Sequence, residues 1–391
     1  MLKNVLKILS GNGLAQLIQF CGLFLLVRLF NPEEFSSLAI VQSIATIVAV
    51  MLSWQLHHVI PLTAEKRKRG LVFSSIFIQI LLLSIVFIFI ALLTKSCELV
   101  FGVLLGLLLS YYNLNISYLS SNKCFGYISL VMIARALFTV FLQILFSKVK
   151  LEYSIIWAVL LAEVLVQCLF VNNYRNVTFN IKSIKRKLLK IYKERKDFYI
   201  YGSFSELVAI SAFFLPLYFI DHKFGEIASG NYGMASRLVW APVVLVSSSI
   251  CQVLYAKMGD MSRLESITYI RSIRLINVVI VLIFVSLIAF LAQPLYSILL
   301  GDKWSIAIKM IPIMVIWGMV FLATSVYRLS YRVFSIQRNL LMIDMLYLIC
   351  MYLLFIMINS NEIVYLTSIV VTNFIFSVIT IILLLAKVGK E

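Results

Sequence analysis

Eight charged side chains lie within, or at the ends of, long apolar segments of this sequence. They are five arginines and three carboxylates: Arg28, Arg135, Arg237, Arg328, Arg332, Glu163, Glu206 and Asp344. A charge at the centre of a membrane-spanning helix costs roughly 2.5–3.5 kcal/mol on insertion scales, so such residues usually face a protein-lined cavity. A guanidinium group binds phosphate through two parallel hydrogen bonds. We therefore expect the arginines to bind an anionic group and the carboxylates to balance charge or to couple to protons.

A second interpretation of the same residues is structural. Charges inside a bilayer also pair with one another, and a pair such as Arg135 with Glu163 would only hold two helices together. Arg28, Arg328 and Arg332 lie near the ends of their apolar segments, where a long side chain can extend to the membrane interface. The sequence leaves both interpretations open.

The segments that carry these residues have the length and composition of membrane-spanning helices. Of the 391 residues, 62% are hydrophobic and 13% are charged, and the mean hydropathy is +1.02. A helix needs about 20 apolar residues to cross a bilayer. The expected spans are 10–30, 36–58, 71–93, 99–119, 126–147, 153–172, 198–220, 233–255, 275–298, 309–330, 339–359 and 363–386. They predict an all-α integral membrane protein with about twelve transmembrane helices in two six-helix bundles.

The longest connection between these spans, 173–197, is a basic cytoplasmic linker that separates an N-terminal lobe at 1–172 from a C-terminal lobe at 198–391. With a cytoplasmic N-terminus, 25 of the 34 lysines and arginines face the cytoplasm and 7 face the other side. This asymmetry follows the positive-inside rule, so both termini are expected in the cytoplasm. It also accounts for the net charge of +17 without nucleic acid as a partner. The linker is typical of a helix lying on an anionic membrane surface, although a solvated basic linker fits as well.

Motifs for nucleotide hydrolysis and for common hydrolases are missing from the sequence. It contains no G-x-x-x-x-G-K-[ST] loop, no H-E-x-x-H and no G-x-S-x-G. Its six cysteines show no paired spacing. His57 and His58 end the second expected span, where adjacent residues point to different faces of a helix. We expect no enzymatic activity, no cofactor and no metal site.

Several motifs together carry a family resemblance. Gly-Asn-Gly-Leu-Ala-Gln at 11–16 stands near the start of an apolar helix that ends in Arg-Leu, and a Pro-Glu-Glu-Phe turn follows; both the ending and the turn lie within 27–35. The second half contains Phe-Gly, Gly-Asn-Tyr, Ala-Ser-Arg and a proline within 224–242, followed by Gly-Asp-Lys-Trp at 301–304. In this order the sequence resembles bacterial polysaccharide flippases of the Wzx type. It departs from their common form at Ser36, where the family often has Gly.

The resemblance implies a MATE-like, two-lobe fold of the multidrug/oligosaccharidyl-lipid/polysaccharide exporter superfamily, working by alternating access. The implied cargo is an undecaprenyl-pyrophosphate-linked oligosaccharide repeat unit. It would be flipped to the outer leaflet of the bacterial inner membrane for O-antigen (lipopolysaccharide) or capsule assembly. The arginines would then meet the pyrophosphate. Membrane lipids, and a polymerase and chain-length regulator of the same pathway, are the implied partners.

Other functions remain compatible with the sequence. A small-molecule, drug-type antiporter or a peptidoglycan-precursor flippase would belong to the same superfamily. A membrane polysaccharide polymerase fits less well, because such enzymes usually carry a large extracytoplasmic loop and the expected outer loops here are short. A membrane scaffold would not need charges inside its spans.

Overall fold

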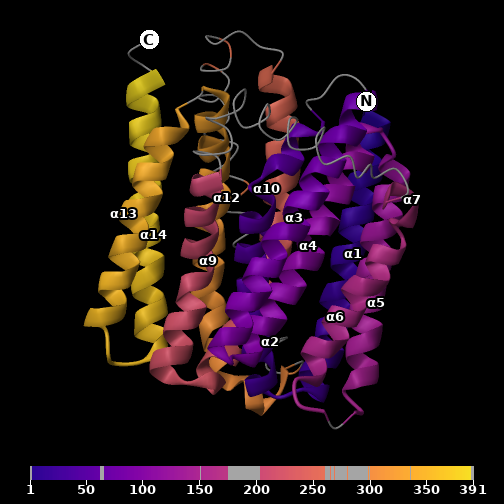
Figure 1. Ribbon diagram of the computed structural model, residues 1–391. Helices are drawn as coiled ribbons and strands as arrows, with labels where there is room; N and C mark the ends of the chain where they lie inside the picture. The colour runs from indigo at the N-terminus through magenta and orange to yellow at the C-terminus, as the bar shows by residue number, and fades with distance from the viewer. Residues whose placement is uncertain are drawn as a thin grey trace. The chain divides into compact units, whose positions relative to one another are not determined.

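The computed structural model describes residues 2–61, 66–149, 151–174, 203–259, 300–334 and 336–388, with a few isolated positions between 260 and 299. All regular elements of these residues are helical (Figure 1). The long helices are α1 (Leu2–Leu29), α2 (Pro32–Ser53), α3 (Lys66–Thr94), α4 (Cys97–Ser121), α5 (Phe125–Phe146), α6 (Ser154–Cys168), α9 (Ser203–Phe224), α10 (Glu226–Gly259), α12 (Ser305–Val333), α13 (Gln337–Met357) and α14 (Glu362–Val388). Short helices are η1 (Leu56–Val59), α7 (Val171–Tyr174) and η3 (Asp302–Trp304). The predicted all-α class is confirmed.

Eleven of the expected spans each overlap one long helix in the described part of the chain. The span expected at 275–298 lies outside the described residues, as does the linker beyond Tyr174. Among the described helices, nine are long and apolar enough to cross a membrane, and α6 is a shorter apolar helix.

The expected ends of two helices, α2 and α9, were wrong because the backbone conformation of single residues decides where a helix stops. α2 ends at Ser53, five residues early, because Trp54 and Gln55 have φ of 44° and 54°, in the left-handed region that ends a helix. At the end of α9, the polar residues after 220 were expected to form a loop. They continue α9 to Phe224, and a single residue, Gly225 with φ of 87°, turns the chain into α10.

The chain divides into two compact units. Unit 1 comprises Met1–Phe30 and Ser37–Ile210, and unit 2 comprises Asn31–Ser36 and Ser211–Glu391. The first turn of α2 therefore belongs to unit 2, whereas the rest of that helix belongs to unit 1. In the same way α9 begins in unit 1 and ends in unit 2.

Small residues bring the helices of unit 1 together. α1 packs along α5, α5 along α6, and α3 along α4. A Cβ added at Gly22 of α1 would lie 2.6 Å from Val140 Cγ2 of α5. One added at Gly106 of α4 would lie 2.9 Å from the Ala45 carbonyl oxygen of α2. Because lipid tails are as apolar as leucine, helices in a bilayer associate through such close packing rather than through hydrophobic burial.

Unit 2 is built around α12, which packs against α10, α13 and α14. Pro216, Pro242 and Pro312 lie inside α9, α10 and α12. Trp240 of α10 and Trp317 of α12 are both buried, and their rings meet edge to face at 5.4 Å. Gly318, beside Trp317, allows the close approach of these two helices, since an added Cβ would lie 2.8 Å from a Val243 methyl.

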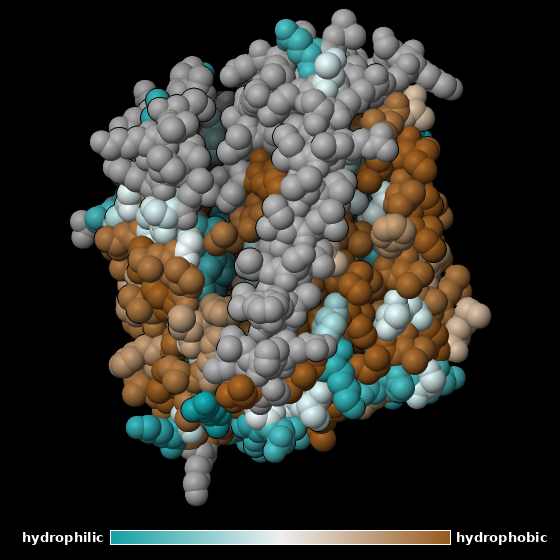
Figure 2. Space-filling view, turned by 180° about the vertical axis from the view of Figure 1, so that it is seen from behind, coloured by the Kyte–Doolittle hydropathy of each residue, from teal (hydrophilic) through white to brown (hydrophobic). Residues whose placement is uncertain are grey.

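Large apolar side chains point outward from the helices. Phe89 and Leu93 of α3 are 63% and 68% exposed, and Phe374 of α14 is 55% exposed. Apolar side chains cover most of the coloured surface in Figure 2, and hydrophilic ones gather at its lower edge. Exposed apolar area of this extent suits lipid rather than water. The chain is a multi-pass membrane protein.

Candidate functional site

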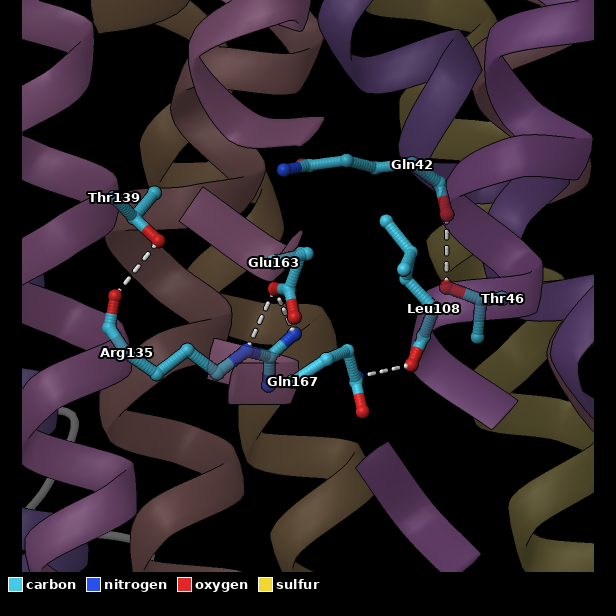
Figure 3. Close-up of polar contacts among 7 residues, drawn as sticks. All are labelled: Gln42, Thr46, Leu108, Arg135, Thr139, Glu163 and Gln167. Atoms are coloured by element: carbon cyan, nitrogen blue, oxygen red, sulfur yellow. Dashed lines mark hydrogen bonds and ion pairs between the residues drawn. The ribbon is translucent and has the colours of Figure 1, made fainter. Parts of the chain in front are cut away.

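An arginine and a glutamate meet in the interior of unit 1 (Figure 3). Arg135 of α5 donates from Nε to Glu163 Oε1 of α6 at 2.6 Å, and its Nη2 lies 2.6 Å from the same oxygen. Both contacts therefore use a single carboxylate oxygen. Glu163 Oε2 is buried and accepts no hydrogen bond from the residues that the structure describes. The two residues predicted as cavity and coupling candidates are thus brought together as a pair.

The two partners of this pair differ in accessibility. The Arg135 side chain is 28% exposed, whereas that of Glu163 is 4% exposed. The guanidinium carbon also lies 4.4 Å from the ring centroid of Tyr112 on α4, a cation–π contact. A ligand that approaches the pair from its accessible side meets the cation first.

Beyond Glu163 along the chain, hydrogen bonds connect α4, α6 and α7. Gln167, one turn after Glu163, donates to the Leu108 carbonyl at 2.9 Å (Figure 3) and accepts from the Tyr174 hydroxyl at 2.6 Å. Asn115 of α4 in turn donates to the Tyr174 oxygen at 2.8 Å. Burial raises the pKa of Tyr174 to about 12, so this phenol stays protonated. These amides hold α6 against α4, one turn from Glu163. Sequence reasoning missed them because uncharged amides in an apolar segment carry no distinctive signal.

A second pair lies within unit 2, where Arg328 of α12 meets Asp344 of α13. Nη1 and Nη2 of the arginine reach Oδ1 and Oδ2 at 2.8 and 2.6 Å. This is a two-pronged contact in which both carboxylate oxygens are satisfied. Its geometry suits a tie between two helices better than a binding group.

The remaining predicted residues are not members of these two pairs. The Arg237 guanidinium carbon of α10 lies 5.2 Å from the ring centroid of Phe35, and that ring meets the Trp304 ring at 5.2 Å, all within unit 2. Arg28 is exposed in the last turn of α1, and Glu206 is half-buried in the first turn of α9. Arg332 lies in α12, and its side chain falls outside the described part of the structure.

Sequence reasoning also missed a polar cluster at the start of α2. The hydroxyls of Ser36 and Ser229 lie 2.6 Å apart, and both donate to Asp221 Oδ1, at 3.2 and 2.6 Å. With Pro32 packed against Gly230, these contacts hold residues 31–36 within unit 2. Asp221 was overlooked because the sequence placed it in a loop between two spans.

The histidine pair differs from the expectation. His57 and His58 do not lie on opposite faces of α2, because the left-handed residues Trp54 and Gln55 end that helix first. Both lie in η1, and their ring centroids are 4.1 Å apart. Burial, and to a lesser extent His58, lowers the pKa of His57 to about 3. Among the described residues, no group of three or more His, Cys, Asp or Glu side chains could hold a metal ion.

The order and packing of these helices define a known class of membrane protein fold, that of MATE-like transporters. Over 99% of this chain and 96% of the other, the structure matches an outward-facing multidrug resistance MATE family transporter of the MOP superfamily, with a TM-score of 0.64 at 13% identity. A MOP superfamily transporter from Pyrococcus furiosus matches with a TM-score of 0.65 at 13% identity, over 99% and 96% of the two chains. A Vibrio cholerae MATE transporter matches with a TM-score of 0.62 at 12% identity, over 100% and 96%.

No protein-family model and no curated protein sequence matches the chain. At identities near 13% the structural matches establish the fold alone. The predicted MATE-like fold is confirmed, and the predicted flippase specificity stays a prediction.

Proposed function

We propose that this protein flips undecaprenyl-pyrophosphate-linked oligosaccharide repeat units across the bacterial inner membrane, from the cytoplasmic to the outer leaflet. The observation that carries the proposal is the accessible guanidinium of Arg135, held inside a transmembrane unit by Glu163 and Tyr112. A pyrophosphate headgroup is anionic, and arginine is the side chain best suited to bind it by paired hydrogen bonds.

The transporter fold supports this proposal, because it supplies two units that can alternate access to a lipid substrate. The Pyrococcus furiosus neighbour is described as having a binding pocket of reversed polarity that suggests a different function. That description supports a binding pocket whose polarity differs among transporters of this fold. The absence of a nucleotide-binding loop from the sequence favours an ion gradient or the substrate gradient as the energy source.

Within this proposal, Arg135 of unit 1 and Arg237 of unit 2 are each candidates for headgroup binding, and Arg237 is oriented by its contact with the Phe35 ring. Arg328 and Asp344 form a structural tie, because their two-pronged contact satisfies both partners. The lipid-linked oligosaccharide and the surrounding lipids are the proposed partners, together with a polymerase and a chain-length regulator of the same assembly pathway.

The test is a flipping assay in proteoliposomes with a labelled undecaprenyl-pyrophosphate oligosaccharide, measuring label accessibility on each face. We expect Arg135→Ala and Arg237→Ala to slow flipping at least tenfold while the protein still reconstitutes. The matched control is Lys148→Ala, which removes an exposed cation from the turn after α5. Equal rates for all four proteins would remove the arginines from the mechanism, and no flipping by the wild type would contradict the proposed cargo.

A small-molecule antiporter is the second candidate, because two of the three neighbours described above are named as MATE transporters, one of them a multidrug resistance transporter. Gradient-driven uptake of a cationic dye by the same vesicles would favour this function. Flipping of the lipid without dye uptake would contradict it.

A further inference from the structure

The first turn of α2 belongs to one unit while both of its flanks belong to the other. Residues 31–36 lie in unit 2, whereas the chain before Asn31 and the chain after Ser36 lie in unit 1. MATE family transporters of this fold are described in outward-facing and in inward-facing conformations, and alternating access moves one helical bundle against the other. A segment tied to unit 1 at both ends cannot keep all of its contacts with unit 2 during such a movement.

Unit 2 holds this turn by hydrogen bonds and by one close backbone contact. The Ser36 and Ser229 hydroxyl oxygens lie 2.6 Å apart, and Asp221 Oδ1 accepts from them at 3.2 and 2.6 Å. Both serines are buried, at 1% and 0% exposure. Pro32 lies so close to Gly230 that an added Cβ would collide with the Pro32 carbonyl. All of these contacts can break and form again without a covalent change, so they make a reversible attachment.

The turn also carries its own helix cap. The backbone N–H of Asn31 donates to Glu34 Oε2 at 2.9 Å, an arrangement in which the third helical residue caps the residue before the helix. Pro32 occupies the first helical position, where its fixed φ suits a helix and its missing N–H costs nothing. Both features lie within the turn and do not depend on unit 2. The turn can therefore leave its site as a folded piece of helix.

Phe35 connects this turn to a proposed binding residue. Its side chain is fully buried, at 0% exposure. The Arg237 guanidinium carbon lies 5.2 Å from the centroid of the Phe35 ring, and the Trp304 ring packs edge to face against it, with 5.2 Å between the centroids. A guanidinium over an aromatic face is attracted by the ring. Departure of the turn takes this ring away from Arg237, which leaves the cation available to another partner.

We propose that the first turn of α2 is a releasable latch on unit 2, held by Asp221 and fitted against Gly230, and that its release frees Arg237 from the Phe35 ring. The identity of the anion that the freed Arg237 binds rests on the proposed function, whereas the latch itself does not. Because linkage is reciprocal, an anion that prefers the freed Arg237 also favours the released turn, by the same factor.

A reversible disulfide tests whether transport needs the release. Cysteines in place of two hydroxyls that lie 2.6 Å apart are within reach of a disulfide, so oxidised Ser36→Cys/Ser229→Cys should keep the turn docked. In the proteoliposome flipping assay we expect this protein to be at least tenfold slower than wild type and to recover on reduction. Ser36→Cys and Ser229→Cys alone, treated with the same oxidant, control for the six native cysteines.

Labelling of a single cysteine follows the release without any lipid cargo. Position 36 is buried while the turn is docked, so the reaction of Ser36→Cys with N-ethylmaleimide, followed by mass spectrometry of its peptide, reports the released state. Asp221→Ala in this background should speed labelling about tenfold. The matched control is Glu226→Ala, which removes an exposed carboxylate from the start of α10 and keeps the carbonyl that accepts from Ser229. Inorganic pyrophosphate should also speed labelling, and Arg237→Ala should abolish that effect.

The outcomes separate this inference from the proposed function. Flipping at the wild-type rate by the oxidised double variant would overturn the latch and leave the flippase proposal standing. Absence of flipping by the wild type, with labelling that still accelerates in Asp221→Ala, would contradict the flippase proposal and support the latch. Equal labelling with and without Asp221 would overturn the latch whatever the cargo. Labelling that ignores pyrophosphate would overturn the link to Arg237.

Discussion

At the scale of single residues, the described helices contain two arginine–carboxylate pairs, and the sequence suggested one of them. The pairing of Arg135 with Glu163 follows from their presence in neighbouring expected spans. The pairing of Arg328 with Asp344 was not predicted, because it depends on how far α12 and α13 are shifted along each other. The axial offset between these two helices cannot be read from the sequence of one protein. The sequence also does not show that Arg135 contacts only Oε1 of Glu163, because that choice depends on how the surrounding side chains pack.

The Arg328–Asp344 pair yields a stability prediction. Asp344 is 7% exposed at its side chain, so removing Arg328 leaves a buried carboxylate without its cation. We expect Arg328→Met to destabilise the protein by about 3–5 kcal/mol, and Arg328→Met with Asp344→Leu to recover most of that loss. Thermal unfolding in detergent, followed by tryptophan fluorescence, measures both. Equal Tm values for the single and double variants would show that the pair does not tie the helices together.

His57 predicts how stability depends on pH. The unfolded chain binds a proton at the ordinary histidine pKa of 6.5, whereas the folded protein binds it only at about 3. The unfolded state therefore holds more protons between these values, and stability falls as the pH drops from about 6.5 towards 3. We expect His57→Gln to flatten the Tm profile over this window.

The exposed neighbour His58 serves as the control for that experiment. Because burial is the larger cause of the lowered pKa of His57, His58→Gln should keep most of the slope. A slope that disappears in His58→Gln and persists in His57→Gln would reverse the assignment.

At the scale of helices, hydrophobic length predicts which segments are helical, and local backbone conformation decides where they end. The expected second span ran to residue 58 because apolar residues continue that far, yet two left-handed residues stop α2 at Ser53. Conversely, the charged residues at 221–223 continue α9, because one glycine suffices to turn the chain. Apolar content therefore determines neither the end of α2 nor the end of α9.

Gly230 of α10 provides a test of helix packing. A Cβ at this position would collide with the Pro32 carbonyl, so glycine permits the contact that holds residues 31–36 in unit 2. We expect Gly230→Ala to lower Tm clearly and to raise cysteine accessibility at an engineered Ser36→Cys. Gly13→Ala in α1 is the control, since nothing lies within 4 Å of an added Cβ there. A Tm equal to that of the control would show that α10 shifts without cost.

At the scale of the whole molecule, the fold class could be predicted because composition alone demands a bilayer. A mean hydropathy of +1.02 leaves too few polar residues for a water-facing surface. The cargo could not be predicted in the same way. It depends on a few side chains, such as Arg237 over Phe35, whose neighbours come from distant parts of the chain.

The distribution of basic residues also predicts which way the helices cross the membrane. The cysteines Cys97 and Cys124 are both exposed; Cys97 is the first residue of α4 and Cys124 follows its last turn, so they report opposite faces of the bilayer. With the N-terminus in the cytoplasm, Cys97 faces outward and Cys124 faces the cytoplasm. In variants that keep one of these two cysteines, a membrane-impermeant maleimide should label Cys97 in intact spheroplasts and Cys124 only after permeabilisation. The reverse result would invert the topology and place Lys66–Arg69 on the outer side. Labelling of both in intact spheroplasts would mean that α4 does not span the membrane.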